Sequence, residues 1–292
     1  MLKIDNSRAI NRVFSKNVLY DLLHTGNNNV FDYVVQRYAK NPKNKTYSEL
    51  ISEIYVHLSK EQRNEYYYKN TLLNKLLIKK HSVNTTTALT QMRVGKSIAD
   101  FVMINGEGKI YVFEIKSDLD NFNRLESQLR DYYKVFSKVT VVVSENEFEK
   151  TNNLLSQFSD IGNFVGIYVL TERNALSERL KKEPLQFDKF LTHECIFKLL
   201  RKYEYENVLN SYFGNVPQTE PVFHFRTCFK RFCEIPILEA QTLTFKELKK
   251  RNKITKSDFK LVQSELKSAV YFSNLSQNLV ALNQLLQTIY RR

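Results

Sequence analysis

The chain has 292 residues, which allows one large or two ordinary domains. Aromatic residues are abundant, with 20 Phe and 17 Tyr, whereas Gly and Pro number only 7 and 5, which argues against collagen-like, disordered and turn-rich all-β classes. The net charge of +13 favours a polyanionic partner such as nucleic acid, although a soluble basic protein without such a partner would be compatible with the same charge.

The chain carries no sign of export or membrane insertion. Its N-terminal segment lacks the apolar core of a signal peptide, and no apolar run is long enough to span a bilayer. The three cysteines, Cys195, Cys228 and Cys233, lack zinc-knuckle spacing and are expected to be reduced, mostly buried thiols. We therefore expect a cytoplasmic protein without a membrane segment.

Helical periodicity dominates the first part of the chain. Residues 1–60 predict a small helical segment, because apolar residues recur at helical spacing in three runs separated by polar breaks. Residues 61–81 predict the clearest early helix, with one apolar stripe formed by Leu72, Leu73, Leu76 and Leu77.

The pattern then changes to short β-rich runs at residues 88–94, 98–104 and 110–116. The first two runs are separated by Gly95-Lys96-Ser97, and the last two by the tetrapeptide that begins with Asn105-Gly106. Asn-Gly between two β-rich runs is a strong hairpin signal. Three strands are therefore predicted to form antiparallel neighbours.

Helices and buried strands alternate after the hairpin. An amphipathic helix is predicted over residues 121–136, and either Asp118 or Asp120 is expected to cap its N-terminus. A buried strand over 139–143, a helix over about 147–158 and a second buried strand over 165–170 follow. This order predicts an α/β core with a mixed sheet.

Residues 172–292 lack β alternation and predict a mostly helical region. The region holds 21 basic and 13 acidic residues, so it carries +8 of the net charge of +13. Within it, HFRTCFKRF interleaves cations with aromatic rings, a pattern that suits both single-stranded nucleic acid and an ordinary amphipathic helix.

Three polar residues stand out in the predicted hairpin. Asp100 lies in one arm, and Glu114 and Lys116 lie two residues apart in the other. Because strand side chains alternate, Glu114 and Lys116 share one face with Val112. A Glu and a Lys at the end of an apolar strand are unsuited to a hydrophobic core, so they indicate a functional site.

Phosphodiester hydrolysis is the chemistry that these residue types fit. Mg²⁺ prefers oxygen ligands from one or two carboxylates completed by water and phosphate, so Asp100, Glu114 and the carbonyl of Ile115 are the predicted ligands. Mn²⁺ is expected to substitute for Mg²⁺. Lys116 is predicted to orient the attacking water or to stabilise the developing negative charge.

Asp100 followed by Glu114-Ile115-Lys116 resembles the motif of the PD-(D/E)XK nuclease superfamily, with Ala99 at the proline position. The stretches EYYYKN, LTQMRVG, ADFVMING and EIKSDLDNFNRLESQL also resemble a bacterial and phage-borne nuclease-like group within it, over residues 61–145. The resemblance implies a restriction-endonuclease-like core at 61–171 with a mixed central sheet flanked by helices. A helical N-terminal segment at 1–60 and a basic, mostly helical C-terminal domain at 172–292 would flank this core.

The resemblance also implies site residues around the motif. Glu65 stands where many such nucleases carry an acid on the helix before the sheet, although an acid in a first helical turn is also ordinary. Gln128 and Arg124 share a helix face that would reach the scissile phosphate, or that would simply be solvated. Gln91 stands where related sequences carry Glu, which leaves a fourth acidic ligand open.

Two functions remain open. The first is an active Mg²⁺-dependent nuclease that acts on DNA. The second is a catalytically weak or inactive nuclease-fold protein that binds nucleic acid or a protein partner in phage defence or counter-defence, because a fold does not fix a function. The basic C-terminal region is the expected surface for substrate, for a protein partner or for a homodimer.

Overall fold

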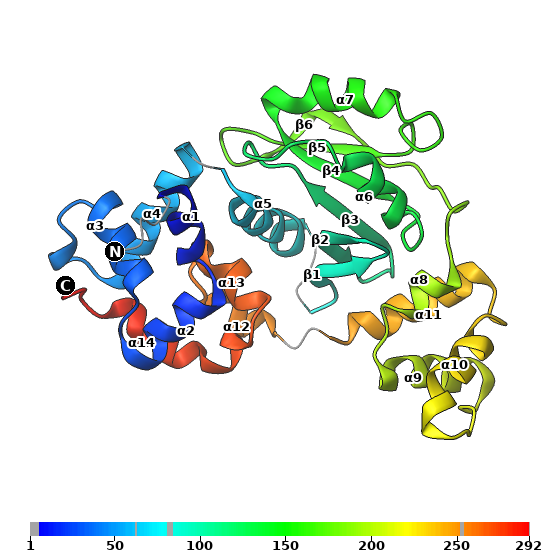
Figure 1. Cartoon of the computed structure of the whole chain (residues 1–292). Helices are drawn as coiled ribbons and strands as arrows, with labels where there is room; N and C mark the ends of the chain where they lie inside the picture. The colour runs from blue at the N-terminus through cyan, green and yellow to red at the C-terminus, as the bar shows by residue number, and fades with distance from the viewer. Residues whose placement is uncertain (1–5, 62, 81–83, 252–253, 292) are drawn as a thin grey trace.

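A six-stranded mixed sheet lies at the centre of the molecule (Figure 1). The computed structural model describes residues 6–61, 63–80, 84–251 and 254–291. The strands lie side by side in chain order: β1 (Thr87–Val94), β2 (Ser97–Ile104), β3 (Ile110–Ile115), β4 (Val139–Ser144), β5 (Gly166–Leu170) and β6 (Leu176–Lys182).

The strand directions follow from the connections. β1, β2 and β3 are antiparallel neighbours joined by the two predicted turns, and Asn105 closes the second turn by accepting from the backbone N–H groups of Glu107 and Lys109. β3, β4 and β5 are parallel, and their crossovers contain α6 (Leu125–Tyr132) and, after η3 (Glu145–Glu147), α7 (Phe148–Ser156). β6 returns antiparallel to β5. The predicted α/β class with a mixed sheet is confirmed.

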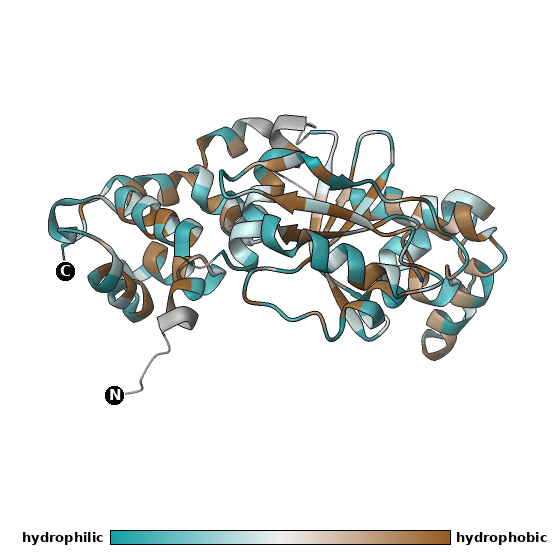
Figure 2. Cartoon of the chain, turned by 90° about the horizontal axis from the view of Figure 1, so that it is seen from above, coloured by the Kyte–Doolittle hydropathy of each residue, from teal (hydrophilic) through white to brown (hydrophobic). Residues whose placement is uncertain are grey.

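Helices cover both faces of this sheet. One face, which includes Phe101 and Phe113, packs against α5 (Glu65–Leu72) and its π-helical continuation η2 (Leu73–Lys80). The other face, which includes Val102 and Val112, packs against α6 and the helices that follow the sheet. Figure 2 shows hydrophobic residues concentrated along the central strands. The helix predicted over 61–81 is confirmed from Glu65 to Lys80, but it begins later than predicted, because Asn64 caps it and Glu61 belongs to the preceding helix. Residues 62 and 81 lie outside the described residues.

The two ends of the chain form one helical unit, here called the terminal lobe. The backbone N–H of Tyr47 donates to Thr288 at 3.1 Å, and that of Tyr290 donates to Lys45 at 2.8 Å. Figure 1 shows these first and last helices together beside the sheet. The lobe contains α1 (Asn6–Val13), α2 (Lys16–Thr25), α3 (Asn29–Tyr38), η1 (Pro42–Asn44), α4 (Tyr47–Glu61), α12 (Lys256–Leu261), η4 (Ser264–Leu266), α13 (Lys267–Tyr271), η5 (Asn274–Asn278) and α14 (Leu279–Gln287).

A second helical unit, here called the distal lobe, follows β6. Its helices are α8 (His193–Phe197), α9 (Lys202–Phe213), α10 (Pro221–Phe232) and α11 (Ile237–Lys249). Glu204, only 1% exposed, accepts from the Arg251 guanidinium at 2.6 and 2.7 Å and from the backbone N–H of Arg201 at 2.6 Å. This ion pair joins the start of α9 to the short segment after α11.

Residues 172–292 are therefore mostly helical, as predicted. They contribute strand β6 to the sheet, and their helices belong partly to the distal lobe and partly to the terminal lobe. β6 was not predicted, because its sequence LSERLKK is largely charged. Charged edge strands are common, since charge discourages pairing with another chain. Among the described residues, no helix is long and apolar enough to cross a membrane.

The cysteines are free, and only Cys228 is buried, whereas Cys195 is half-buried and Cys233 is exposed. The expectation of mostly buried thiols was therefore wrong for two of the three.

Candidate active site

The sheet brings Asp100 and Glu114 together where two strands separate. β2 pairs with β3 from Ile104↔Ile110 up to Phe101↔Phe113, and the same register one residue further sets Asp100 opposite Glu114. Beyond this point β2 continues only beside β1, while β3 continues beside β4 through Ile115. The two carboxylates therefore flank the split, on the sheet face that α6 covers.

Glu114 is the most heavily bonded side chain of the site and is 2% exposed. Its Oε1 accepts from Lys116 Nζ at 2.9 Å and from Gln128 Nε2 at 2.6 Å, and its Oε2 lies 2.5 Å from the Tyr132 hydroxyl. Gln128 also accepts from Lys116 Nζ at 2.9 Å. Three side chains thus hold Glu114, and two of them come from α6.

Asp100 is bonded through the backbone of the neighbouring strand. Its Oδ2 accepts from the N–H of Ile115 at 2.9 Å. Burial, and after it the negative charges of Glu114 and Glu65, raise the pKa of Asp100 to about 7. A carboxyl group surrounded in this way gains from any cation that enters the site.

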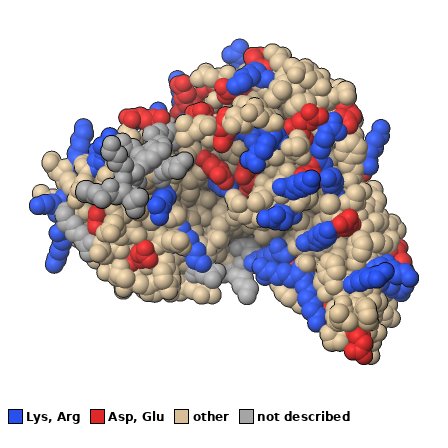
Figure 3. All heavy atoms as spheres, in the orientation of Figure 1, with Lys and Arg blue, Asp and Glu red and all other residues tan. Residues whose placement is uncertain are grey.

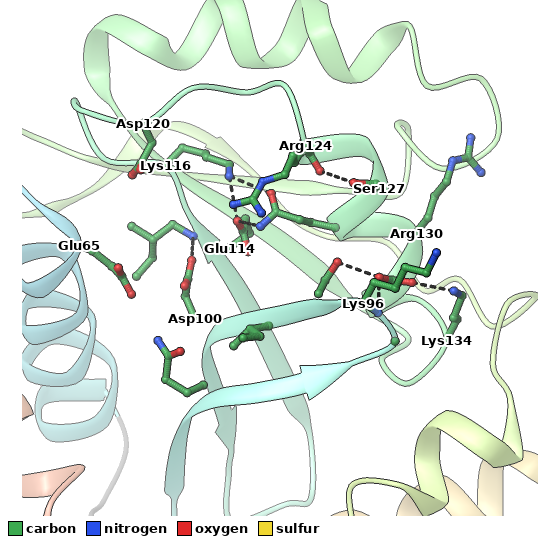
Figure 4. A pocket seen from close by; sticks show the side chains of 17 residues that line it. Glu65, Lys96, Asp100, Glu114, Lys116, Asp120, Arg124, Ser127, Arg130 and Lys134 are labelled. Carbon is green, nitrogen blue, oxygen red and sulfur yellow. Dashed lines mark hydrogen bonds and ion pairs between the residues drawn. The ribbon is translucent and has the colours of Figure 1, made fainter.

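Glu65 lies in the first turn of α5 and points toward Asp100 (Figure 4). It forms a short ion pair with Lys69 one turn later, and Lys69 Nζ lies 4.0 Å from Asp100 Oδ1. Lys69 is 8% exposed, so its charge faces this cluster and not open water. Asp100 and Glu114 thus each have a lysine beside them, Lys69 and Lys116 respectively.

Glu65, Asp100, Glu114, Lys116 and Gln128 line a cleft of about 890 Å³. Arg124, at the N-terminus of α6, extends over Lys116, and Lys96, Arg130 and Lys134 follow toward the other end of the cleft (Figure 4). Figure 3 shows Lys and Arg side chains gathered over the part of this face where the core meets the distal lobe. An acidic centre is therefore bordered by cations.

Two of these cations are available for a ligand. Arg130 is bound by Glu126 and Asp160, and Lys134 is bound by Asp131. Among the described residues, no hydrogen bond or ion pair engages the side chains of Lys96 and Arg124, both of which are exposed.

The residues present fit a metal ion of the Mg²⁺ type. The N–H of Ile115 points to Asp100, and because the N–H and C=O of one strand residue face the same edge, its carbonyl faces the same gap. Asp100, Glu114 and this carbonyl would supply the protein ligands, with water filling the remainder. Within the described ranges, no three His, Cys, Asp or Glu side chains are grouped closely enough to hold a metal by themselves. Glu65 is instead paired with Lys69.

Two expectations near the motif need correction. Neither Asp118 nor Asp120 caps α6, whose N-cap residue is Arg124. Asp118 accepts from Arg63 and from the Tyr68 hydroxyl, and Asp120 accepts from the N–H and hydroxyl of Ser117. The loop after β3 is longer than the sequence pattern indicated, so α6 begins at Leu125 and not near Asn121.

Gln91 lies in β1 at the position that the register sets opposite Asp100, and its φ of 56° is in the left-handed region. Non-glycine residues rarely adopt this conformation, and it is found preferentially at functional sites. Gln91 lines the cleft, so a neutral amide stands where the resemblance implied an acid.

Sequence reasoning missed Lys69 and Tyr132. Lys69 was predicted only as part of a helix, and Tyr132 has the apolar periodicity of α6. Asp131 was also missed: its carboxylate accepts from the N–H of Lys96 and the hydroxyl of Ser97, which joins the β1–β2 turn to α6. A Lys four residues after Glu65 was the one available signal.

The comparisons with known proteins point to phages. A family model described as bacteriophage P4 protein cII matches residues 58–279. Protein cII of Enterobacteria phage P4 is 34% identical over 88 residues, which are 30% of this chain and 32% of that protein. The match thus spans about a third of the relative's length. No solved structure matches the chain.

Proposed function

We propose that this chain, which belongs to the bacteriophage P4 protein cII family, is a metal-dependent nuclease that hydrolyses phosphodiester bonds in DNA. The observation that carries the proposal is the convergence of Asp100, Glu114 and Lys116 on one cleft, from two strands that separate at that point. Carboxylates paired with a lysine beside a cationic border suit a phosphate substrate better than a small neutral one.

The order of elements supports a restriction-endonuclease-like core of the PD-(D/E)XK type. A helix (α5) precedes three antiparallel strands, and a helix (α6) then leads to a strand parallel to β3. In this arrangement the Asp and the Glu-x-Lys stand on the two neighbouring strands that the resemblance assigns to them.

The residues divide the work of hydrolysis. When bound by Asp100, Glu114 and the Ile115 carbonyl, Mg²⁺ would acidify a water and neutralise charge on the phosphate. Lys116 would stabilise the charge that develops as the water oxygen bonds to phosphorus and the ester P–O bond breaks. Gln128, which bonds both Glu114 and Lys116, would hold these two groups in their relative positions.

Cations around the cleft would hold the phosphate backbone. Arg124 extends over the acidic centre and is the first candidate for the scissile phosphate, and Lys96 would hold a neighbouring phosphate. The net charge of +13 would raise the encounter rate with a polyanion and make binding depend on salt.

One observation favours a second candidate, a nuclease-like protein that binds nucleic acid without cutting it. Both oxygens of Glu114 already have protein partners, namely Lys116, Gln128 and Tyr132. To bind a metal ion, Glu114 would have to give up some of these hydrogen bonds. A site in which all of them persist would therefore not bind the ion. Isothermal titration with Mn²⁺ separates the two candidates, because only the nuclease requires binding that disappears in Asp100→Asn.

Cleavage of supercoiled plasmid and of linear DNA in Mg²⁺ and in EDTA tests the proposal directly. Asp100→Asn, Glu114→Gln and Lys116→Met should each reduce the rate by about 100-fold or more, since each removes a ligand or a charge-stabilising group. Glu220→Gln, an exposed acid at the start of α10, is the control for the loss of one carboxylate and should cleave at the wild-type rate. Equal cleavage by all variants would reject the assignment.

A further inference from the structure

We propose that the cleft continues into a second groove that holds an unpaired segment of the nucleic acid strand being cut. This inference rests on the proposed function and adds a substrate class to it: DNA with a single-stranded segment next to the scissile phosphate. The groove is defined here as the cavity of about 540 Å³ between the terminal lobe and the sheet, and is called the strand groove.

The strand groove and the catalytic cleft share two residues. Glu65 and Gln91 line both cavities, so the groove begins where the acidic centre ends. From there it runs between α5, β1 and α13 toward Asn11 on α1 and Lys16 at the start of α2. A polymer that crosses the catalytic centre can therefore continue into it without turning away from the protein.

The lining of the groove differs in chemistry from that of the cleft. The cleft is bordered by four cations besides Lys116, whereas the described residues that line the groove include one exposed cation, Lys16, because Lys69 is buried in its pair with Glu65. Few phosphates can therefore be neutralised in the groove. A duplex, which presents a dense array of phosphates on its surface, would find little to bind there.

The remaining lining suits exposed bases. Phe272 is half-buried in the groove wall, held edge-to-face by Phe101 and Tyr271, and an aromatic ring that stays partly open can stack on a base. In the described part of the chain, no bond engages the amide of Gln91 or the amide nitrogen of Asn11. Such amides can bond base edges that pairing would otherwise hide.

The groove wall joins both ends of the chain to the core. Asn11 and Lys16 come from the first helices, Gln91 from the sheet, and Phe272 from the residues after α13. The terminal lobe thus gains a role that the nuclease core alone does not assign to it.

Fluorescence anisotropy of the full chain in EDTA, where metal-dependent cleavage is absent, tests the inference. Three labelled DNAs are compared: a blunt duplex, the same duplex with a single-stranded overhang, and the overhang strand alone. The two DNAs with unpaired bases should bind about tenfold more tightly than the blunt duplex. Phe272→Leu, which keeps an apolar side chain against Phe101, should remove about fivefold of that affinity through loss of stacking.

Matched variants make the test specific. Lys16→Ala, on an exposed residue, should weaken the overhang complex and reduce its salt dependence by about one phosphate contact. Lys43→Ala and Phe223→Leu, an exposed cation in η1 and a ring that is 55% exposed on α10, should leave the affinity unchanged. The melting temperature of Phe272→Leu checks that it folds.

Each outcome decides the question. Equal affinity for overhang and blunt duplex, or no binding of either, overturns the inference. Loss of affinity in Phe223→Leu instead of Phe272→Leu also overturns it and moves the strand to the distal lobe. If plasmid cleavage depends on Asp100 while Phe272→Leu binds normally, the nuclease stands without the groove. If the groove variants lose binding and no cleavage occurs, the groove stands without the nuclease.

Discussion

Replacing Asp100 with Asn should stabilise the protein while it abolishes metal binding. Burial, and then the charges of Glu114 and Glu65, raise the pKa of Asp100 to about 7. The folded protein therefore keeps a proton that the unfolded chain releases. The contribution of this carboxyl to stability is complete below pH about 4 and is lost as the pH rises through about 7.

The size of the effect follows from the same values. The difference between about 7 and the ordinary 3.8 corresponds to about 4 kcal/mol of unfolding free energy above pH 7, at about 1.4 kcal/mol per pH unit. Asn keeps an oxygen that can accept from the Ile115 N–H, and the attraction of Lys69 at 4.0 Å already contributes to the pKa of about 7, so it is not subtracted again. We therefore expect a net gain of about 4 kcal/mol.

Urea unfolding in EDTA measures this gain. The unfolding free energy of Asp100→Asn should exceed that of the wild type by about 4 kcal/mol at pH 8, and the difference should shrink toward zero at pH 4. Saturating Mn²⁺ should stabilise only the wild type, because the variant lacks a ligand. Equal stability at pH 8, or a variant less stable than the wild type there, would refute the view that the surroundings disfavour the ionised form of Asp100.

Three further substitutions test other parts of the structure. Gln91→Glu adds a carboxylate beside the proposed ligands and should tighten Mn²⁺ binding about tenfold by calorimetry; unchanged affinity would place residue 91 beyond the metal's reach. Gly95→Ala should lower the unfolding free energy by about 2 kcal/mol, because Gly95 has φ 59° and a Cβ would lie 2.6 Å from Asp131 Oδ1; thermal unfolding within experimental error of the wild type would contradict this. Arg251→Met should cost about 3 kcal/mol in urea unfolding by leaving buried Glu204 unpaired, and a neutral effect would mean that water replaces the guanidinium.

The sheet was predictable because its signals are local. The turns at Gly95-Lys96 and Asn105-Gly106 have residues that accept tight turns, and the apolar runs of β4 and β5 are long enough to require burial. With the turns known, the register of the hairpin follows, and the register alone brings Asp100 opposite Glu114.

The remaining features depend on contacts between distant segments. Nothing local marks Lys69 as a neighbour of Asp100, or Tyr132 as a partner of Glu114, since both lie in ordinary helical patterns. The same holds for the terminal lobe, in which Tyr290 donates to Lys45 across nearly the whole chain. Tertiary pairing of this kind leaves no periodic signal in the sequence.

A crystal of the full chain soaked in Mn²⁺, with anomalous data collected at the manganese edge, tests the central claim most directly. We predict one strong peak in the gap between β2 and β3, about 2 Å from Asp100, from Glu114 and from the Ile115 carbonyl, with Lys116 shifted off Glu114 Oε1. Soaked crystals in which Lys116 and Gln128 still hold Glu114, and in which manganese lies elsewhere or nowhere, would contradict the assignment of this cleft as a nuclease centre.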